Sequence, residues 1–298
     1  MKVTPLDEAL PRRRPRRVAV GTFDGVHLGH REVIRGSDTV LTFDPHPLQV
    51  LRPEAMPKLL DSFAVKRDLI ASLRVDELVV VPFDREFAAQ NHDRFVDAVL
   101  VERLGATHVS VGENFRFGRA ARGDAEYLRS RPEFETRVVP IVEVEGETVS
   151  SSHIRALVAA GDVAAAARFL GAPFTLVGEV VTGDRRGRDL GMPTANLVPD
   201  DRIVCPGHGV YAATADGRPA AINVGVRPTF ESGRGVLIEA HLIDFDDDLY
   251  GRTLRIAFLE RLRGERRFDS VEALVEQMHV DVADARRILS AAASVSPP

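Results

Sequence analysis

Two histidines stand directly after the first candidate strand of the chain, at a spacing that suits phosphate binding. The segment reads GTFDGVHLGH, and His27 and His30 share one face of the helix predicted to begin there. Gly29 would let a ligand approach the backbone closely, and the helix start offers free N–H groups and a positive dipole end. We therefore expect a polyphosphate to bind here; the alternative is a plain turn with two partly buried histidines.

A second predicted helix start carries hydroxyl groups and an arginine. Ser151 and Ser152 lie at its beginning, and Arg155 follows one turn later. By itself such a segment is only a good helix cap. Because both helix starts are expected at the end of a sheet, however, the two could converge on one triphosphate.

A third polar segment, residues 112–118, directly follows the fourth candidate strand and contains Asn114 and Arg116. Ligands of open parallel sheets bind beyond the carboxyl ends of the strands. We therefore expect Arg116 to contact an anion.

The second half of the chain opens with a cationic loop that could wrap phosphates. Its glycines recur every four residues, with arginines between them: Gly183, Gly187 and Gly191. After Pro193, Thr194 and Asn196 lie two apart on an extended segment and so face the same side. Two oxygen ligands on one side suit Mg²⁺, which combines few protein ligands with phosphate oxygens and water. The alternative is a turn followed by an edge strand.

Glu239 lies in the candidate strand 236–245, on the same face as His241 and Ile243. If that face points inward, a carboxylate there is costly unless it has a purpose. A general base is one such purpose. A structural ion pair with a buried arginine is the other, and the residues alone leave both open.

Strands and helices alternate through the first half of the chain. Val-rich segments bounded by Gly, Pro and Asp predict strands at 17–21, 40–43, 77–81, 107–112 and 137–142. Helical patterns separate them at 27–35, 62–73 and 92–104, the last with Asn91 as a cap and Gly105 as a stop. This alternation predicts an α/β fold, a parallel sheet with helices on both faces.

The pattern changes after a helical pair at 153–160 and 163–170. Closely spaced strands are predicted at 174–182, 210–215, 220–226, 236–245 and 253–259, with Asp216-Gly217 as a hairpin turn. They indicate a small antiparallel barrel or a sandwich. A closing helix is expected from Asp269, with Glu272 completing a capping box.

The length and composition fit two globular domains, which we place at 1–170 and 171–298. A single cysteine, Cys205, excludes an intrachain disulfide and a four-cysteine zinc site. There is no apolar run of membrane-spanning length, and the formal net charge of -5 disfavours nucleic acid as a partner. We expect a cytoplasmic protein that acts on small molecules and has no membrane or nucleic-acid partner. The sequence leaves open whether it forms a homo-oligomer.

The motifs of the first half resemble the adenylyltransferase half of bacterial bifunctional FAD synthetases. They are GTFDGVHLGH, TFDPHP at 42–47, GENFRFG at 112–118 and SSSHIR at 150–155. The resemblance implies a Rossmann-like nucleotidyltransferase domain that transfers AMP from ATP to FMN and releases pyrophosphate. It makes His27 and His30 catalytic and implies ATP or phosphate contacts for Thr22, Phe23, Asp24, Gly29, Asn114, Arg116, Ser151, Ser152 and Arg155. The sequence departs from the family pattern at Thr22, Asn114 and Ser152, and the segment after His30 is short.

The second half resembles riboflavin kinase. The motifs are GDxxGRxLGxPTAN at 183–196, GVY at 209–211, NVGVRPTF at 223–230 and EAHLIDF at 239–245. The resemblance implies a small antiparallel β-barrel that makes FMN and ADP from riboflavin and ATP. It assigns Mg²⁺ to Thr194 and Asn196, the proton of the ribityl hydroxyl to Glu239, and the nucleotide to the loop with Gly183, Gly187 and Gly191.

The leading hypothesis is therefore a bifunctional transferase that makes FMN and then FAD. A second hypothesis keeps only the kinase, with the first domain as a nucleotide-binding or regulatory module. A third is a non-catalytic flavin or nucleic-acid binder that uses the basic segment 11–17.

Overall fold

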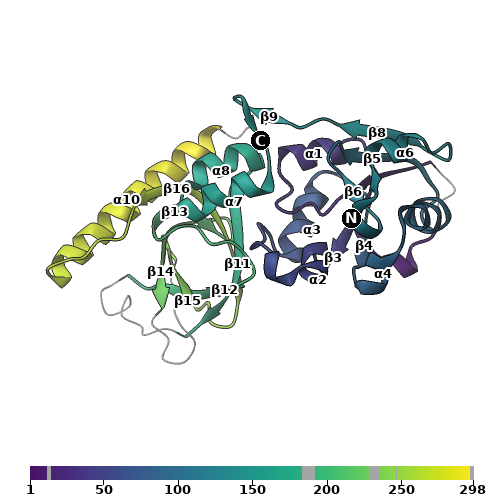
Figure 1. The fold of residues 1–298 in the computed structure, drawn as a ribbon. Helices are drawn as coiled ribbons and strands as arrows, with labels where there is room; N and C mark the ends of the chain where they lie inside the picture. The colour runs from purple at the N-terminus through teal and green to yellow at the C-terminus, as the bar shows by residue number, and fades with distance from the viewer. Residues whose placement is uncertain (12–14, 183–191, 228–234, 246, 296–298) are drawn as a thin grey trace. The chain divides into compact units, whose positions relative to one another are not determined.

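The computed structural model describes residues 1–11, 15–182, 192–227, 235–245 and 247–295. The chain divides into two compact units (Figure 1). Unit 1 contains Met1–Pro57 and Phe63–Ser151, and unit 2 contains Lys58–Ser62 and Ser152–Pro298. The chain thus passes between the units at three points. The division of the sequence into domains at 170 and 171 stays a prediction.

Unit 1 is built on a six-stranded parallel sheet of order β1-β4-β3-β2-β5-β8. The strands are β1 (Lys2–Pro5), β2 (Arg16–Val20), β3 (Thr39–Asp44), β4 (Glu77–Pro82), β5 (Ala106–Gly112) and β8 (Glu135–Val139). This confirms the predicted parallel α/β architecture. Strand β1 was not predicted: it is a short edge strand that pairs with β4, and its four residues give little periodicity.

Helices cover both faces of this sheet. Val18 and Val20 pack in one apolar cluster with the π-helix η3 (Phe95–Arg103), whereas Ala19 and Val40 pack in another with α1 (Leu28–Ile34) and α3 (Phe63–Ser72). The predicted cap is present, since Arg94 N donates to Asn91 Oδ1 at 2.7 Å. The remaining elements of unit 1 are η1 (Leu6–Glu8), α2 (Pro47–Leu51), η2 (Pro53–Ala55), α4 (Arg85–Ala89), α5 (His92–Arg94), β6 (Arg116–Phe117), η4 (Arg119–Ala121), β7 (Gly123–Asp124), α6 (Ala125–Arg129), β9 (Glu143–Val144) and β10 (Glu147–Thr148).

A buried polar network ties four strands together at the amino ends of β3 and β4. Arg16, 1% exposed, forms an ion pair with Glu77 at 2.5 Å and donates to Thr39 Oγ1 at 3.1 Å. It also donates to the carbonyl of Leu104 at 3.2 Å. Thr4 of the edge strand donates to the second carboxylate oxygen of Glu77 at 2.6 Å. The network therefore lies at the amino end of the sheet. Ligands are expected at the other end, beyond the carboxyl ends of the strands.

Unit 2 contains a closed antiparallel barrel of order β11-β12-β15-β14-β13-β16. Its strands are β11 (Phe174–Val181), β12 (Ala195–Pro199), β13 (Gly209–Ala215), β14 (Arg218–Arg227), β15 (Gly235–Leu242) and β16 (Thr253–Arg263). The barrel prediction is confirmed and the sandwich is excluded. Asp216 and Gly217 form the predicted two-residue turn, with φ of 47° and 78°.

The described part of unit 2 also contains α7 (Ser151–Ala160), which begins at the last residue of unit 1, α8 (Val163–Leu170) and α10 (Val271–Val295). Asp162 caps α8, as predicted, by accepting from Ala165 N at 3.0 Å. Helix α10 begins near Asp269, as predicted, but its cap is Ser270, which accepts from Ala273 N at 3.1 Å. Among the described residues, no helix has the length and apolar character needed to cross a membrane.

We expect Arg16→Met to lower the free energy of unfolding by about 3–5 kcal/mol, because it leaves the buried Glu77 carboxylate without its cation. Urea unfolding of the full chain, followed by circular dichroism, measures this change. Arg35→Met is the matched control: the Arg35 side chain is 75% exposed and pairs with Glu32 on the surface. Its loss should lower the free energy by no more than about 1 kcal/mol. Equal losses in both variants would contradict the role given to the buried network.

Candidate active sites

The turn after β2 brings the two histidines into direct contact. His27 caps α1, and its Nδ1 accepts from His30 N at 3.3 Å. The two imidazole rings stack, with centroids 3.6 Å apart and planes 16° from parallel. The ring of Phe23 packs edge-on against His30 at 5.4 Å. The spacing of three residues therefore produces one stacked pair rather than two independent side chains.

Both histidines favour the neutral form. Burial lowers the pKa of His27 from the ordinary 6.5 to about 4. Burial also lowers the pKa of His30 well below 6.5, and the neighbouring charges of His27 and Lys66 lower it further. Because His27 Nδ1 accepts a hydrogen bond, the proton of its neutral ring lies on Nε2. The pair thus offers N–H donors near pH 7 without a net charge.

A pocket of about 870 Å³ lies at the carboxyl ends of the strands of unit 1. Of the residues singled out in the sequence, five line it: Thr22, Phe23, His30, Asn114 and Arg116. Much of the remaining wall is aromatic, from Phe43, Phe83, Phe87, Phe95, Phe115 and Phe117. The pocket therefore combines a polar edge near the histidine pair with an apolar wall that suits a flat ring system.

Three other predicted residues, Asp24, Gly29 and Ser151, support this turn without lining the pocket. Asp24 is 4% exposed, and its carbonyl accepts from Ser151 Oγ at 3.0 Å, which ties the start of α7 to the turn. A Cβ on Gly29 would lie 3.3 Å from the His27 ring, so this glycine leaves room for the imidazole. Ser152 and Arg155 belong to unit 2, where Arg155 Nη2 donates to Ser152 Oγ at 3.1 Å. Their contact with phosphates stays a prediction.

Two residues that sequence reasoning missed also shape this site. Lys66 is 6% exposed, and its Nζ donates to the carbonyl of Thr22 at 2.9 Å. A lysine in a predicted helix is normally exposed, so the sequence carries no signal of this burial. His46, in the TFDPHP motif, lines the pocket, and its Nδ1 accepts from Leu48 N at 3.2 Å.

In unit 2, three polar residues form a row across neighbouring strands. Glu239 of β15 stands in register with Asn196 of β12 on one side and Asn223 of β14 on the other. Asn223 Nδ2 donates to Glu239 Oε2 at 2.9 Å. Two-residue alternation sends Ile238 and Ala240, both 1% exposed, into the barrel and leaves Glu239 half-buried on its outer face. The inward orientation considered for Glu239 is therefore wrong, and no described residue forms an ion pair with it.

Glu239 instead lines a pocket of about 740 Å³ on the outer face of the barrel. Asn223 and His241 line the same pocket from the strands, and Leu274 and Met278 line it from α10. Phe268, Arg263 and Asp281 also line this pocket. Arg263 and Asp281 form a bidentate ion pair, with a shortest N–O distance of 2.7 Å.

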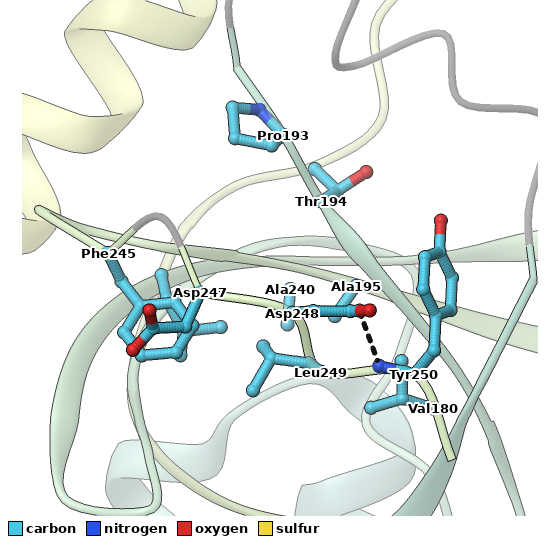
Figure 2. A pocket seen from close by; sticks show the side chains of 11 residues that line it. Val180, Pro193, Thr194, Ala195, Ala240, Phe245, Asp247, Asp248, Leu249 and Tyr250 are labelled. Carbon is cyan, nitrogen blue, oxygen red and sulfur yellow. Dashed lines mark hydrogen bonds between the residues drawn. The ribbon is translucent and has the colours of Figure 1, made fainter. Parts of the chain in front are cut away.

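Thr194 lines this pocket and also a smaller one of about 230 Å³. The smaller pocket is walled by Phe245, Leu249 and Tyr250, together with two aspartates (Figure 2). One of these, Asp248, accepts from Tyr250 N at 3.0 Å. Thr194 therefore stands where the two pockets meet.

Thr194 and Asn196 share the outer face of the barrel, because Ala195 between them is buried. Their hydroxyl and amide oxygens, beside the Glu239 carboxylate, are hard donors that fit Mg²⁺. The described ranges contain no group of three or more His, Cys, Asp or Glu side chains that could hold a metal ion. The predicted glycines of the preceding loop, Gly183, Gly187 and Gly191, lie outside the described residues.

Comparison with known proteins assigns a family to each half of the chain. The FAD synthetase family matches residues 10–153, and the riboflavin kinase family matches residues 170–289. The chain belongs to the family of bifunctional riboflavin kinases/FMN adenylyltransferases. Its family relative from Pseudomonas fluorescens is 35% identical over 92% of this chain and 93% of that protein. The relative from Escherichia coli (strain K12) is 36% identical over 90% of this chain and 91% of its own length.

The family fold is also present in a crystal structure from Streptococcus pneumoniae, of a protein described as a macrolide-efflux protein. It is 31% identical, has a TM-score of 0.85 and covers 96% of this chain and 99% of that chain. Both domains of the bifunctional family are thus present here, which favours the bifunctional hypothesis over the kinase alone.

The buried histidines predict a pH dependence of stability. Above about pH 6.5, neither the folded nor the unfolded chain binds a proton at His27. Between 6.5 and about 4, the unfolded chain binds one that the folded chain does not, so the free energy of unfolding falls as the pH falls. We expect His27→Gln to reduce this slope, while wild type and variant stay parallel above pH 7. Urea unfolding at a series of pH values measures the slope of the free energy of unfolding against pH. An unchanged slope in the variant would contradict the conclusion that burial lowers the pKa of His27.

Proposed function

We propose that this chain phosphorylates riboflavin to FMN in unit 2 and adenylylates FMN to FAD in unit 1. The proposal rests above all on the Asn196–Glu239–Asn223 row beside Thr194, where two pockets meet. A carboxylate held next to oxygen ligands at such a junction suits the transfer of a phosphoryl group to a hydroxyl.

In the proposed kinase reaction, riboflavin occupies the larger pocket and presents its terminal ribityl hydroxyl to Glu239. Glu239 accepts the hydroxyl proton as the oxygen attacks the γ-phosphorus of ATP, and ADP leaves as the bond to the β-phosphate oxygen breaks. The hydrogen bond from Asn223 fixes the orientation of the carboxylate. The adenosine part of ATP fits the smaller pocket, where Tyr250 and Leu249 offer apolar surface.

Thr194 and Asn196 are the residues that would hold Mg²⁺. The ion would neutralise charge on the β- and γ-phosphates. Thr194 lines both pockets, so an ion held by these side-chain oxygens would lie near the junction of the two.

In the proposed adenylyltransferase reaction, the phosphate of FMN attacks the α-phosphorus of ATP, and pyrophosphate leaves. No protein nucleophile is needed, so the residues act by positioning and by stabilising charge on the leaving group. His27 and His30 donate N–H groups to the phosphates, and Arg116, Ser151, Ser152 and Arg155 add further contacts. The aromatic wall of the pocket takes the isoalloxazine ring of FMN.

We assign the adenylyltransferase to residues 1–170 and the kinase to residues 171–298. The substrates are small molecules, and we place the enzyme in the cytoplasm. Nothing in either proposed reaction needs a membrane, a nucleic acid or a second copy of the chain.

Incubation of the purified chain with riboflavin, ATP and Mg²⁺ should yield FMN first and FAD later, as followed by chromatography of the flavins. Chelation of Mg²⁺ should stop FMN formation, because the Thr194 and Asn196 side chains are neutral and cannot balance the negative charge of the phosphates without the ion. FMN that accumulates without FAD, also when FMN and ATP are supplied directly, would refute the adenylyltransferase assignment.

The two activities should respond to opposite mutations. His30→Ala should lower FAD formation by at least ~10²-fold, if the imidazole stabilises charge in the transition state, and should leave FMN formation nearly intact. Glu239→Gln should lower FMN formation by at least ~10²-fold and leave the conversion of supplied FMN to FAD nearly intact. Each variant is the control of the other, and equal loss of both activities in either one would indicate damage to folding.

A further inference from the structure

Two separate segments of unit 1 meet at the aromatic wall of its pocket. Gln90 and Phe95 line the pocket from one segment, and residues 114–117 line it from the other. The segments touch directly, since Arg119 N donates to the carbonyl of Gln90 at 2.8 Å. The width of this part of the pocket therefore depends on how firmly the two segments are held together.

The contact between the segments is too close for side chains at two glycines. A Cβ on Gly118, which has a φ of 70°, would lie 2.7 Å from the backbone of His92. A Cβ on Gly123 would lie 2.8 Å from His92 Cβ. His92 thus packs against the backbone of the segment that carries the second half of the wall.

A single carboxylate connects this segment to helix α6. Asp124 Oδ2 accepts from Arg116, a residue of the pocket wall, at 2.6 Å. Asp124 Oδ1 accepts from Tyr127 N at 2.8 Å and so caps α6. The position of α6 and the position of Arg116 are therefore linked through Asp124.

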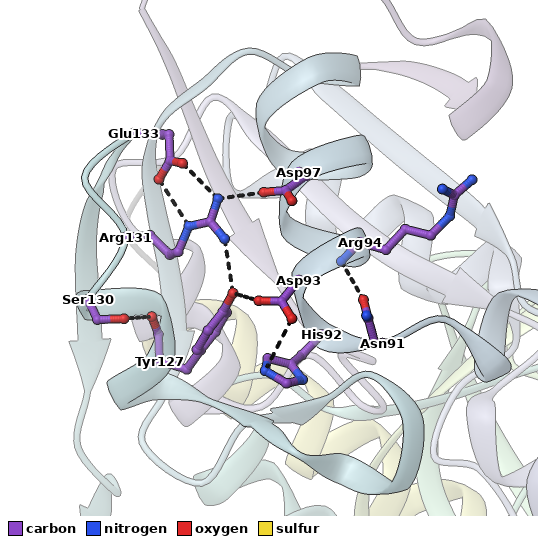
Figure 3. Close-up of polar contacts among 9 residues, drawn as sticks. All are labelled: Asn91, His92, Asp93, Arg94, Asp97, Tyr127, Ser130, Arg131 and Glu133. Atoms are coloured by element: carbon purple, nitrogen blue, oxygen red, sulfur yellow. Dashed lines mark hydrogen bonds and ion pairs between the residues drawn. The ribbon is translucent and has the colours of Figure 1, made fainter.

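From α6, the side chain of Tyr127 reaches back to the first segment (Figure 3). Its ring packs edge-on against His92 at 4.6 Å, and its hydroxyl donates to Asp93. Arg131 Nη1 donates to the same hydroxyl at 2.9 Å, and Arg131 Nη2 pairs with Asp97 at 2.5 Å. The Arg131 side chain is only 16% exposed, and these bonds form a network, which is stronger than an isolated surface pair.

We propose that Tyr127 and Arg131 are positioning residues of the adenylyltransferase site, which brace the two segments and so set the width of the FMN pocket. Neither residue is among those that line the pocket. The role rests on the function proposed for unit 1. Without these contacts, a smaller fraction of the protein molecules has the pocket at the width that binds FMN. The apparent affinity for FMN falls in proportion to that fraction.

The test measures FAD formation by the full chain from FMN and ATP, with variants Tyr127→Phe and Arg131→Gln. Tyr127→Phe removes the hydroxyl and keeps the ring against His92. We expect each variant to raise KM for FMN about 5-fold, with kcat within about twofold of wild type. KM for ATP should rise less than KM for FMN, because Arg116 is the one proposed phosphate contact that the network holds. Hydrogen exchange of residues 112–121 should speed up in both variants.

Two controls accompany these variants. Arg129→Gln changes an exposed arginine at the end of α6, whose guanidinium pairs with Glu126 at 3.3 Å, and should keep the wild-type KM for FMN. Phosphorylation of riboflavin by each variant should also match wild type, since the brace lies within unit 1.

The outcomes are distinct. A wild-type KM for FMN in both variants, with normal turnover by the wild-type chain, would overturn the brace alone. A parallel loss of kcat in both reactions would also overturn it, because that result reports damage to folding. Absence of FAD from the wild-type reaction would overturn the proposed function of unit 1 and this role with it.

Discussion

Hydrogen bonding between neighbouring strands is the constraint on which both candidate sites depend. In the barrel, the register fixes Asn196, Glu239 and Asn223 as neighbours although they are far apart in the sequence. A slip of one residue in β15 would turn Glu239 into the apolar interior and bring Ile238 to the pocket. Closure of the barrel removes free edges and resists such a slip, so the register that places the Glu239 carboxylate at the pocket is also the one that buries the core.

In the parallel sheet of unit 1, the buried polar network that stabilises the fold and the candidate site lie at opposite ends of the strands. The amino ends carry the buried Arg16–Glu77 network, where each charged or polar atom finds a protein partner. The carboxyl ends lead into turns with strained residues, since Phe23 and Val26 have φ of 51° and 40°. Lys66 donates a hydrogen bond to the Thr22 carbonyl, so a buried cation helps to stabilise the backbone of this strained turn.

Local signals in the sequence were sufficient for most of the fold. Helix caps such as Asn91 and Asp162, the Asp216-Gly217 turn and the Val-rich runs are each short-range features, and the structure contains them all. Strand β1, with the sequence KVTP, was not predicted because it contains no apolar run, and the region of β12 was predicted only as an extended segment. The motifs also located the His27–His30 pair and the Thr194–Glu239 region. The orientation of Glu239, the burial of Lys66 and the aromatic wall could not be predicted, because each depends on which strands pair and on what packs across them.

The stacked histidines limit how unit 1 can stabilise charge. The two rings lie 3.6 Å apart, and burial lowers the pKa of both, so each is neutral near pH 7 in the free protein. In the proposed reaction they would meet ATP as neutral donors. A neutral pair binds the ground-state phosphates less tightly than two cations would. In the proposed reaction, negative charge added to the leaving pyrophosphate would raise the proton affinity of the imidazoles and strengthen their hydrogen bonds. Their contribution would then grow along the reaction, which is the condition for lowering a barrier rather than only binding a substrate.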